Sequence, residues 1–130
     1  KTIFFFFYDE TSSPKMNWRL LTDEQQIEEM VEISNDQVVI IFKHSTRCSI
    51  SSATLGRLER SWKSEEVGDL KPYFLDLIAN RPISNQVAED FGVWHESPQV
   101  LIIQNGVSVF DTSHFDISFD VIKTQLASLV

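Results

Sequence analysis

Apolar residues along the chain gather in short runs, with polar stretches and helix-like segments between them. Residues 38–42 (Val-Val-Ile-Ile-Phe) contain no polar side chain and are largely β-branched, which is typical of a strand buried on both faces. Residues 73–78 and 100–103 are further strand candidates. Asn105-Gly106 is a preferred two-residue turn pair, so residues 100–103 and 107–110 are predicted to form a hairpin.

The segments between these strands carry apolar residues at helical spacing. Thr22 followed by Gln25 fits a capping box and predicts where the first helix begins. Pro82 suits the first turn of the third helix, and Gly92 suits its end. The apolar stripes of the four predicted helices are Ile27, Met30 and Val31; Leu55, Leu58 and Trp62; Val87, Ala88 and Phe91; and Phe119, Ile122, Leu126 and Leu129.

A short strand predicted at residues 18–21 completes the order β-α-β-α-β-α-β-β-α. Helical crossovers favour parallel strands and a hairpin adds an antiparallel one, so we expect an α/β fold with a mixed central sheet flanked by helices. The order is similar to that of the thioredoxin fold. We therefore expect a single thioredoxin-like domain at residues 17–130, with residues 1–16 as an N-terminal extension or a segment appended to the natural chain.

Composition narrows the classes of function. The chain has 130 residues, of which 11 are basic and 19 acidic, and its net charge of −8 argues against nucleic acid as a partner. No apolar run reaches the roughly 18–20 residues of a membrane span, so no membrane partner is expected. The single cysteine excludes an internal disulfide and a multi-thiolate zinc site, and it favours a reducing, cytoplasmic setting without a bound metal.

Cys48 is the candidate nucleophile. It follows the strand at residues 38–42 and a predicted loop at residues 43–47, and it precedes a helix. Free amides and the positive dipole end of a helix N-terminus stabilise a thiolate, which is the nucleophilic form of cysteine. Arg47 is adjacent, with His44 and Thr46 nearby, so the surroundings are cationic and polar in an otherwise acidic chain.

Ser51 stands where a dithiol redox site would have its second cysteine. Its hydroxyl is expected either to hydrogen-bond the Cys48 sulfur or to cap the helix. A single thiol leaves exchange as the available chemistry, in which Cys48 takes over the adduct of a mixed disulfide and an external thiol removes it. His44 is either a base or adduct contact, or a structural histidine at the strand end.

Four separated motifs resemble the monothiol bacilliredoxin family, the YtxJ-like redox proteins of the bacillithiol system. The resemblance covers residues 17–130, and its motifs are residues 42–51 (FKHSTRCSIS), 81–85 (RPISN), 95–99 (HESPQ) and 113–117 (SHFDI). Several members have proline where this chain has Ser49, a change that alters the start of the helix but leaves the nucleophile in place. Within the fourth motif, His114 and Asp116 are expected to cap the last helix.

The resemblance implies an enzyme, a thiol–disulfide oxidoreductase that removes bacillithiol, or a related low-molecular-weight thiol, from bacillithiolated client proteins. Catalysis would fall to Cys48, with the thiol as cosubstrate and no bound cofactor. In thioredoxin-like proteins a cis-proline faces the active cysteine, which implies a cis Ser97–Pro98 bond in the substrate-binding loop. His95 and Glu96 of this loop would either recognise the adduct or fix the loop. Bacillithiol carries two carboxylates, which Arg47 or Lys43 would meet.

Two other functions stay open from the sequence. A non-catalytic thioredoxin-like binding domain would contain an unreactive Cys48, and the rate of thiol labelling separates it from an enzyme. An iron–sulfur carrier of the monothiol glutaredoxin type also uses Cys-x-x-Ser. This chain lacks the glycine after the cysteine, the Val-Pro before the hairpin and the later Gly-Gly pair of those carriers. The oligomeric state does not follow from the sequence.

Overall fold

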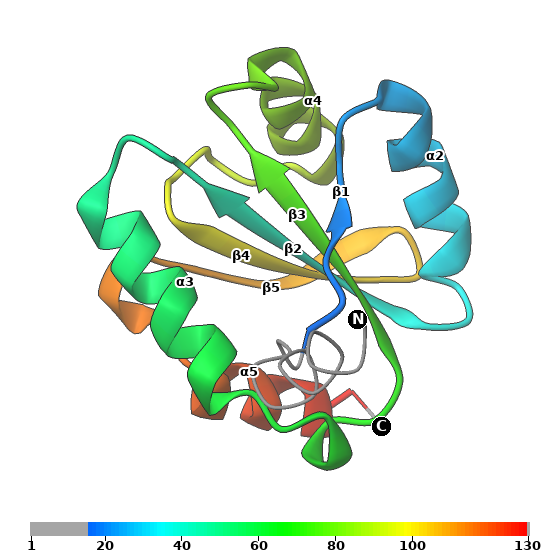
Figure 1. The fold of residues 1–130 in the computed structure, drawn as a ribbon. Helices are drawn as coiled ribbons and strands as arrows, with labels where there is room; N and C mark the ends of the chain where they lie inside the picture. The colour runs from blue at the N-terminus through cyan, green and yellow to red at the C-terminus, as the bar shows by residue number, and fades with distance from the viewer. Residues whose placement is uncertain (1–15, 130) are drawn as a thin grey trace, which may run out of the picture.

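A five-stranded mixed sheet forms the centre of the domain in the computed structural model, which describes residues 16–129 (Figure 1). The strands are β1 (Arg19–Leu20), β2 (Val38–His44), β3 (Leu70–Asp76), β4 (Gln99–Gln104) and β5 (Val107–Ser113). Their spatial order is β1-β3-β2-β4-β5. β1 and β2 pair parallel with β3, whereas β4 pairs antiparallel with both β2 and β5, so the predicted mixed sheet is confirmed.

Within residues 16–129, four α-helices cover the two faces of this sheet (Figure 1). They are α2 (Glu24–Ile33), α3 (Ser49–Ser61), α4 (Arg81–Phe91) and α5 (Phe119–Ala127), with short 3-10 turns η1 (Ser64–Glu66) and η2 (His114–Asp116). Pro82 lies in the first turn of α4, and Gly92 ends that helix in the left-handed region with φ 65°, as predicted. No helix within residues 16–129 has the length and apolar character needed to cross a membrane.

Alternate residues of β2 face two separate hydrophobic layers. Val39 and Ile41 pack with the buried faces of α2 and α4, which include Met30 and Val87. Ile40 and Phe42 face the opposite layer, formed with α3 and α5 by residues that include Leu58, Trp62 and Ile122. Met16 also packs in this second layer, while the rest of the expected extension lies outside the described residues.

β2 is longer than the apolar run that predicted it. Lys43 pairs with Leu75 of β3 and Gln99 of β4, and His44 pairs with Asp76, so both residues belong to the strand and not to a loop. Both are buried. β3 pairs with both residues and β4 with Lys43, which extends β2 and shortens the loop before Cys48 to residues 45–47.

The two predicted helix caps are wrong in register. Asp23, not Thr22, is the N-cap of α2: its carboxylate accepts from the Gln25 N–H (2.9 Å), and the Gln26 side chain accepts from the Asp23 N–H (3.0 Å). A carboxylate is a better acceptor for these amides than a hydroxyl. At α5 the cap is Ser118, whose hydroxyl accepts from the Val121 N–H (3.1 Å). His114 and Asp116 form η2 instead.

Candidate functional site

Cys48 is the N-cap residue of α3 and is partly exposed. Its N–H donates to the Ser45 carbonyl (3.2 Å), and its own carbonyl accepts from the Ser52 N–H (3.1 Å), so the backbone on both sides is fixed. Its side chain caps no amide of the helix. The amides of the first turn of α3 therefore remain available to stabilise a thiolate at this position.

Ser51 is buried beneath the turn that carries Cys48. Its Oγ accepts from the Ser45 N–H (3.1 Å) and lies 2.7 Å from His44 Nδ1. A hydroxyl can accept and donate at the same time, so while Oγ accepts the Ser45 N–H its own O–H can donate to the imidazole nitrogen. The hydroxyl thus fulfils neither role expected from the sequence; instead it ties the loop at residues 45–47 to the end of β2.

His44 is a buried histidine on the α3 side of the sheet. Its ring lies 6.3 Å from that of Phe42 and 5.5 Å from that of Phe74, between centroids. Burial lowers the pKa of His44 below its ordinary value, although the negative charges of Asp76 and Glu59 oppose that shift. The imidazole of His44 is therefore neutral at neutral pH, and in this state its Nδ1 contacts the Ser51 hydroxyl.

The Ser97–Pro98 bond is cis, as predicted. β4 begins directly after it, and the pairing of Lys43 with Gln99 places Pro98 beside the end of β2. Because the chain turns from the end of β2 into Cys48, the proline and the cysteine lie at the same edge of the sheet. The Pro98 carbonyl accepts from the His114 N–H (3.0 Å), which joins η2 to this edge.

The remaining predicted site residues lie in two segments: the turn at residues 45–47 and the loop at residues 94–98, which we call the proline loop. Thr46 and Arg47 are exposed in the turn before Cys48. In the loop at residues 94–98, Glu96 Oε1 lies 3.3 Å from His114 Nε2, and His95 Nδ1 lies 3.4 Å from Ser84 Oγ. His95 therefore contacts α4, and Glu96 contacts η2.

Sequence reasoning missed the position of Lys43. Its side chain is fully buried on the face that Val39 and Ile41 share, and its Nζ lies 3.5 Å from His95 Nδ1. Burial lowers the pKa of Lys43 to about 8. The two-residue alternation of β2 could have placed Lys43 on this face, had the strand been extended to include it. Of the two cations expected to meet an adduct, Arg47 alone is exposed.

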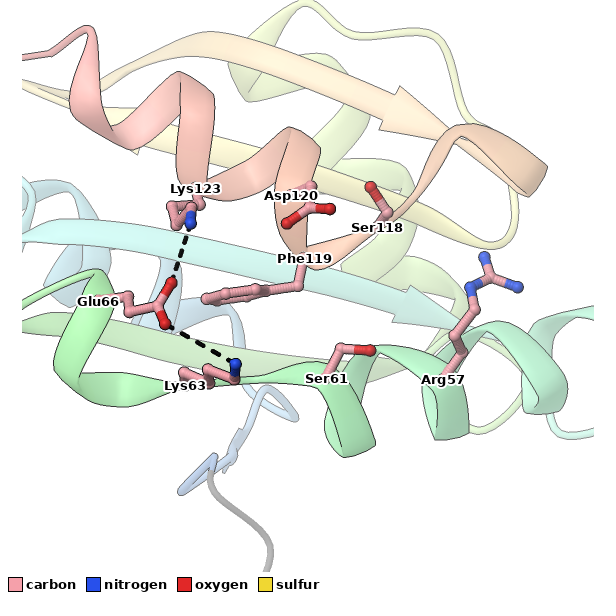
Figure 2. A pocket seen from close by; sticks show the side chains of 8 residues that line it. All are labelled: Arg57, Ser61, Lys63, Glu66, Ser118, Phe119, Asp120 and Lys123. Atoms are coloured by element: carbon pink, nitrogen blue, oxygen red, sulfur yellow. Dashed lines mark hydrogen bonds and ion pairs between the residues drawn. The ribbon is translucent and has the colours of Figure 1, made fainter.

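A separate hollow of about 470 Å³ lies between the second half of α3 and the start of α5 (Figure 2). Lys123 of α5 reaches Glu66 across it (2.9 Å), and Lys63, on the same segment as Glu66, lies 3.9 Å from the other carboxylate oxygen. Arg57 donates to the Ile117 carbonyl (2.9 Å). The hollow lies more than two helical turns along α3 from Cys48, so it is no part of the thiol site. No group of metal-ligating side chains is present in residues 16–129.

The fold and the position of Cys48 define a thioredoxin-fold thiol oxidoreductase with one cysteine. The sequence model of the family described as monothiol bacilliredoxin BrxC matches residues 19–122, and the chain belongs to that family.

Solved structures agree with the fold. A protein described provisionally as an oxidoreductase with a thioredoxin fold is 28% identical, with a TM-score of 0.70 over 83% of this chain and 91% of that one. Malassezia sympodialis thioredoxin is 16% identical (TM-score 0.67, 88% of this chain and 92% of that one). Trypanosoma brucei brucei thioredoxin is 12% identical (TM-score 0.69, 91% and 95%). At these identities the two thioredoxins show the fold alone.

Proposed function

We propose that the protein removes bacillithiol, or a related low-molecular-weight thiol, from mixed disulfides on client proteins. The observation that carries this proposal is the arrangement of Cys48 and Ser51. One partly exposed thiol lies at a helix N-terminus, and a buried serine held by Ser45 and His44 occupies the place of a resolving thiol. Such a site can accept an adduct but cannot release it by forming an internal disulfide.

The exchange balances without any other oxidant or reductant. The Cys48 thiolate attacks the adduct sulfur of the mixed disulfide; the bond to the client sulfur breaks, and the client leaves as a thiolate. One disulfide has been exchanged for another, now between Cys48 and the small thiol. A second molecule of the low-molecular-weight thiol attacks that adduct, forms the small-molecule disulfide and restores the Cys48 thiolate.

The residues around Cys48 and in the proline loop have separate roles in the proposed reaction. The amides of the first turn of α3 stabilise the thiolate, and the exposed Arg47 faces the carboxylates of a bound adduct. Thr46 lies in the same turn, which His44 supports through Ser51. Substrate would bind along the edge formed by Ser97 and Pro98, with His95 and Glu96 beside it. The reaction needs a pool of reduced thiol, so the cytoplasm is the proposed location.

Intact-mass measurement tests the proposal. A client carrying a bacillithiol mixed disulfide is mixed with the wild-type protein, with Cys48→Ser and with Ser51→Ala. The wild type and Ser51→Ala should gain one bacillithiol each and hold it until free thiol is added, whereas Cys48→Ser should leave the client loaded. A client cleared normally by Cys48→Ser would overturn the mechanism. A parallel client carrying a different small thiol shows which adduct is preferred.

A further inference from the structure

Four polar side chains fix the loop at residues 94–98, one of them from the loop itself. Three of them, Lys43, Ser84 and Gln99, are buried, and the fourth, His95, is exposed. Gln99 Nε2 donates to the Trp94 carbonyl (2.9 Å), which holds the loop from the sheet side. Lys43 and Ser84 hold it through the His95 ring, at 3.5 and 3.4 Å from Nδ1.

The chemistry of these groups determines which nitrogen of His95 carries the proton. An ammonium group has three donors and no acceptor, so the atom that faces it has to accept. In neutral histidine one ring nitrogen accepts and the other carries the proton. The Lys43 ammonium faces Nδ1, so the proton belongs on Nε2. Within residues 16–129, Lys43 has no carboxylate partner that would draw its ammonium away from the ring.

The exposed edge of the ring therefore carries an N–H donor. Since Nδ1 faces buried Lys43 and Ser84, Nε2 lies on the opposite side of the ring, toward solution. His95 also lines an open groove of about 560 Å³ along α4, so a small molecule can approach this residue. A hydrogen bond from Nε2 needs an acceptor on the ligand, such as a carboxylate or amide oxygen.

We propose that Lys43 is a positioning residue that fixes His95 in the Nε2–H tautomer, so that the proline loop presents a hydrogen-bond donor to an oxygen of the bound low-molecular-weight thiol. The use of that donor rests on the function proposed above, whereas the tautomer itself does not. The chemistry selects small thiols that carry oxygen acceptors near the sulfur, and it disfavours thiols without them.

The charges around His95 are consistent with this arrangement. Burial lowers the pKa of His95, the positive charges of Lys43 and Arg81 lower it further, and only Glu96 opposes the shift. The ring is therefore neutral at neutral pH, which is the state in which a tautomer exists. Because the pKa of Lys43 is about 8, the lysine is protonated in most molecules at pH 7.

Nitrogen-15 NMR of histidine-labelled protein tests the tautomer directly. At pH 7 the wild-type His95 should carry its proton on Nε2, and that preference should weaken as the pH rises through about 8 and Lys43 loses its proton. In Lys43→Met the Nδ1–H form should increase, because Ser84 Oγ can then accept from it. The control Lys71→Met should not change the His95 signals. A wild-type proton on Nδ1, or an unchanged tautomer in Lys43→Met, would overturn the proposal.

A matched pair of variants tests what the donor does. His95→Gln places an amide near the Nε2 position, whereas His95→Asn places it near Nδ1. With bacillithiol disulfide as the probe, His95→Gln should keep the rate of adduct formation on Cys48, and His95→Asn should lose about two- to tenfold, the range of one hydrogen bond. Equal rates, or the reverse order, would refute the use of the donor. If the wild type forms no adduct at all, the proposed function fails while the tautomer result stands.

Discussion

Replacing Lys43 with methionine should stabilise the protein at neutral pH, and the gain should disappear at high pH. Methionine has a similar length and no charge, so it suits the buried position between the apolar residues of β2 and α4. The wild-type lysine is fully buried; its ammonium group lies 3.5 Å from a neutral histidine nitrogen and forms no ion pair with any residue that the structure describes. Keeping a charge there lowers the free energy of unfolding.

The magnitude follows from the shift in protonation. Burial lowers the pKa of Lys43 from 10.5 to about 8, a difference of about 2.5 pH units, which corresponds to about 3 kcal/mol. Between pH 8 and 10.5 the unfolded chain holds a proton on this lysine that the folded chain has lost. Unfolding then takes up a proton, so the stability of the wild type rises with pH in this window. The penalty is complete below pH 8 and absent above 10.5.

Urea unfolding at pH 7, 8, 9 and 10 measures the effect. The difference in unfolding free energy between Lys43→Met and wild type should be largest at pH 7 and should shrink across the series by up to about 3 kcal/mol. Subtracting the two proteins removes the titration of other groups. Lys71→Met, the same change at a partly exposed lysine of β3, measures what losing a lysine does in general. A Lys43→Met difference that stays constant from pH 7 to 10 would refute the reasoning.

Three further substitutions test the local structure. Asp23→Ala removes the N-cap of α2 and should lower the free energy of unfolding by about 1 kcal/mol in urea. Ser51→Ala leaves the Ser45 N–H without its acceptor and should cost about 1–3 kcal/mol in thermal unfolding, while Cys48 still accepts an adduct. Gly92→Ala places a Cβ on a residue with φ 65° and should cost about 1 kcal/mol through the backbone alone.

Two other positions provide controls for the glycine and serine variants. Gly56→Ala, inside α3, should stabilise the protein by about 1 kcal/mol, because its new Cβ meets only the flexible end of Arg60. Ser52→Ala removes an exposed hydroxyl next to Ser51 and should change stability by less than about 0.5 kcal/mol. Equal effects of the two serine variants would contradict the buried role of Ser51. A stable Asp23→Ala would show that the cap is not Asp23.

The sequence predicted the parts of the fold that depend on local pattern. Unbroken apolar runs identified the buried strands, and Asn105-Gly106 fits the hairpin turn, where both residues have positive φ. Pro82 and Gly92 set the limits of α4 because their backbone preferences act without help from neighbours. The position of Cys48 at a helix start followed from the apolar strand before it and the helical stripe after it.

At the site, the predictions for Lys43, His44 and Ser51 failed because their partners lie outside the local pattern. Lys43 and His44 have the composition of a loop, but pairing of both with β3, and of Lys43 with β4 as well, includes them in the sheet. Ser51 is the third residue of α3 and stands where a dithiol motif has its second cysteine, yet its partners are the Ser45 amide and the His44 ring. No local rule favours those contacts over a bond to the Cys48 sulfur.

Lys43 and His44 point to opposite faces of the sheet, so β2 separates two polar networks. Lys43 reaches the proline loop on the α4 side, and His44 reaches Ser51 on the α3 side. Among the described residues, the two networks share no hydrogen-bond partner. The loop that we propose to meet the small thiol can therefore change its sequence while the support beneath Cys48 stays as it is, although adjacent residues of one strand contact both.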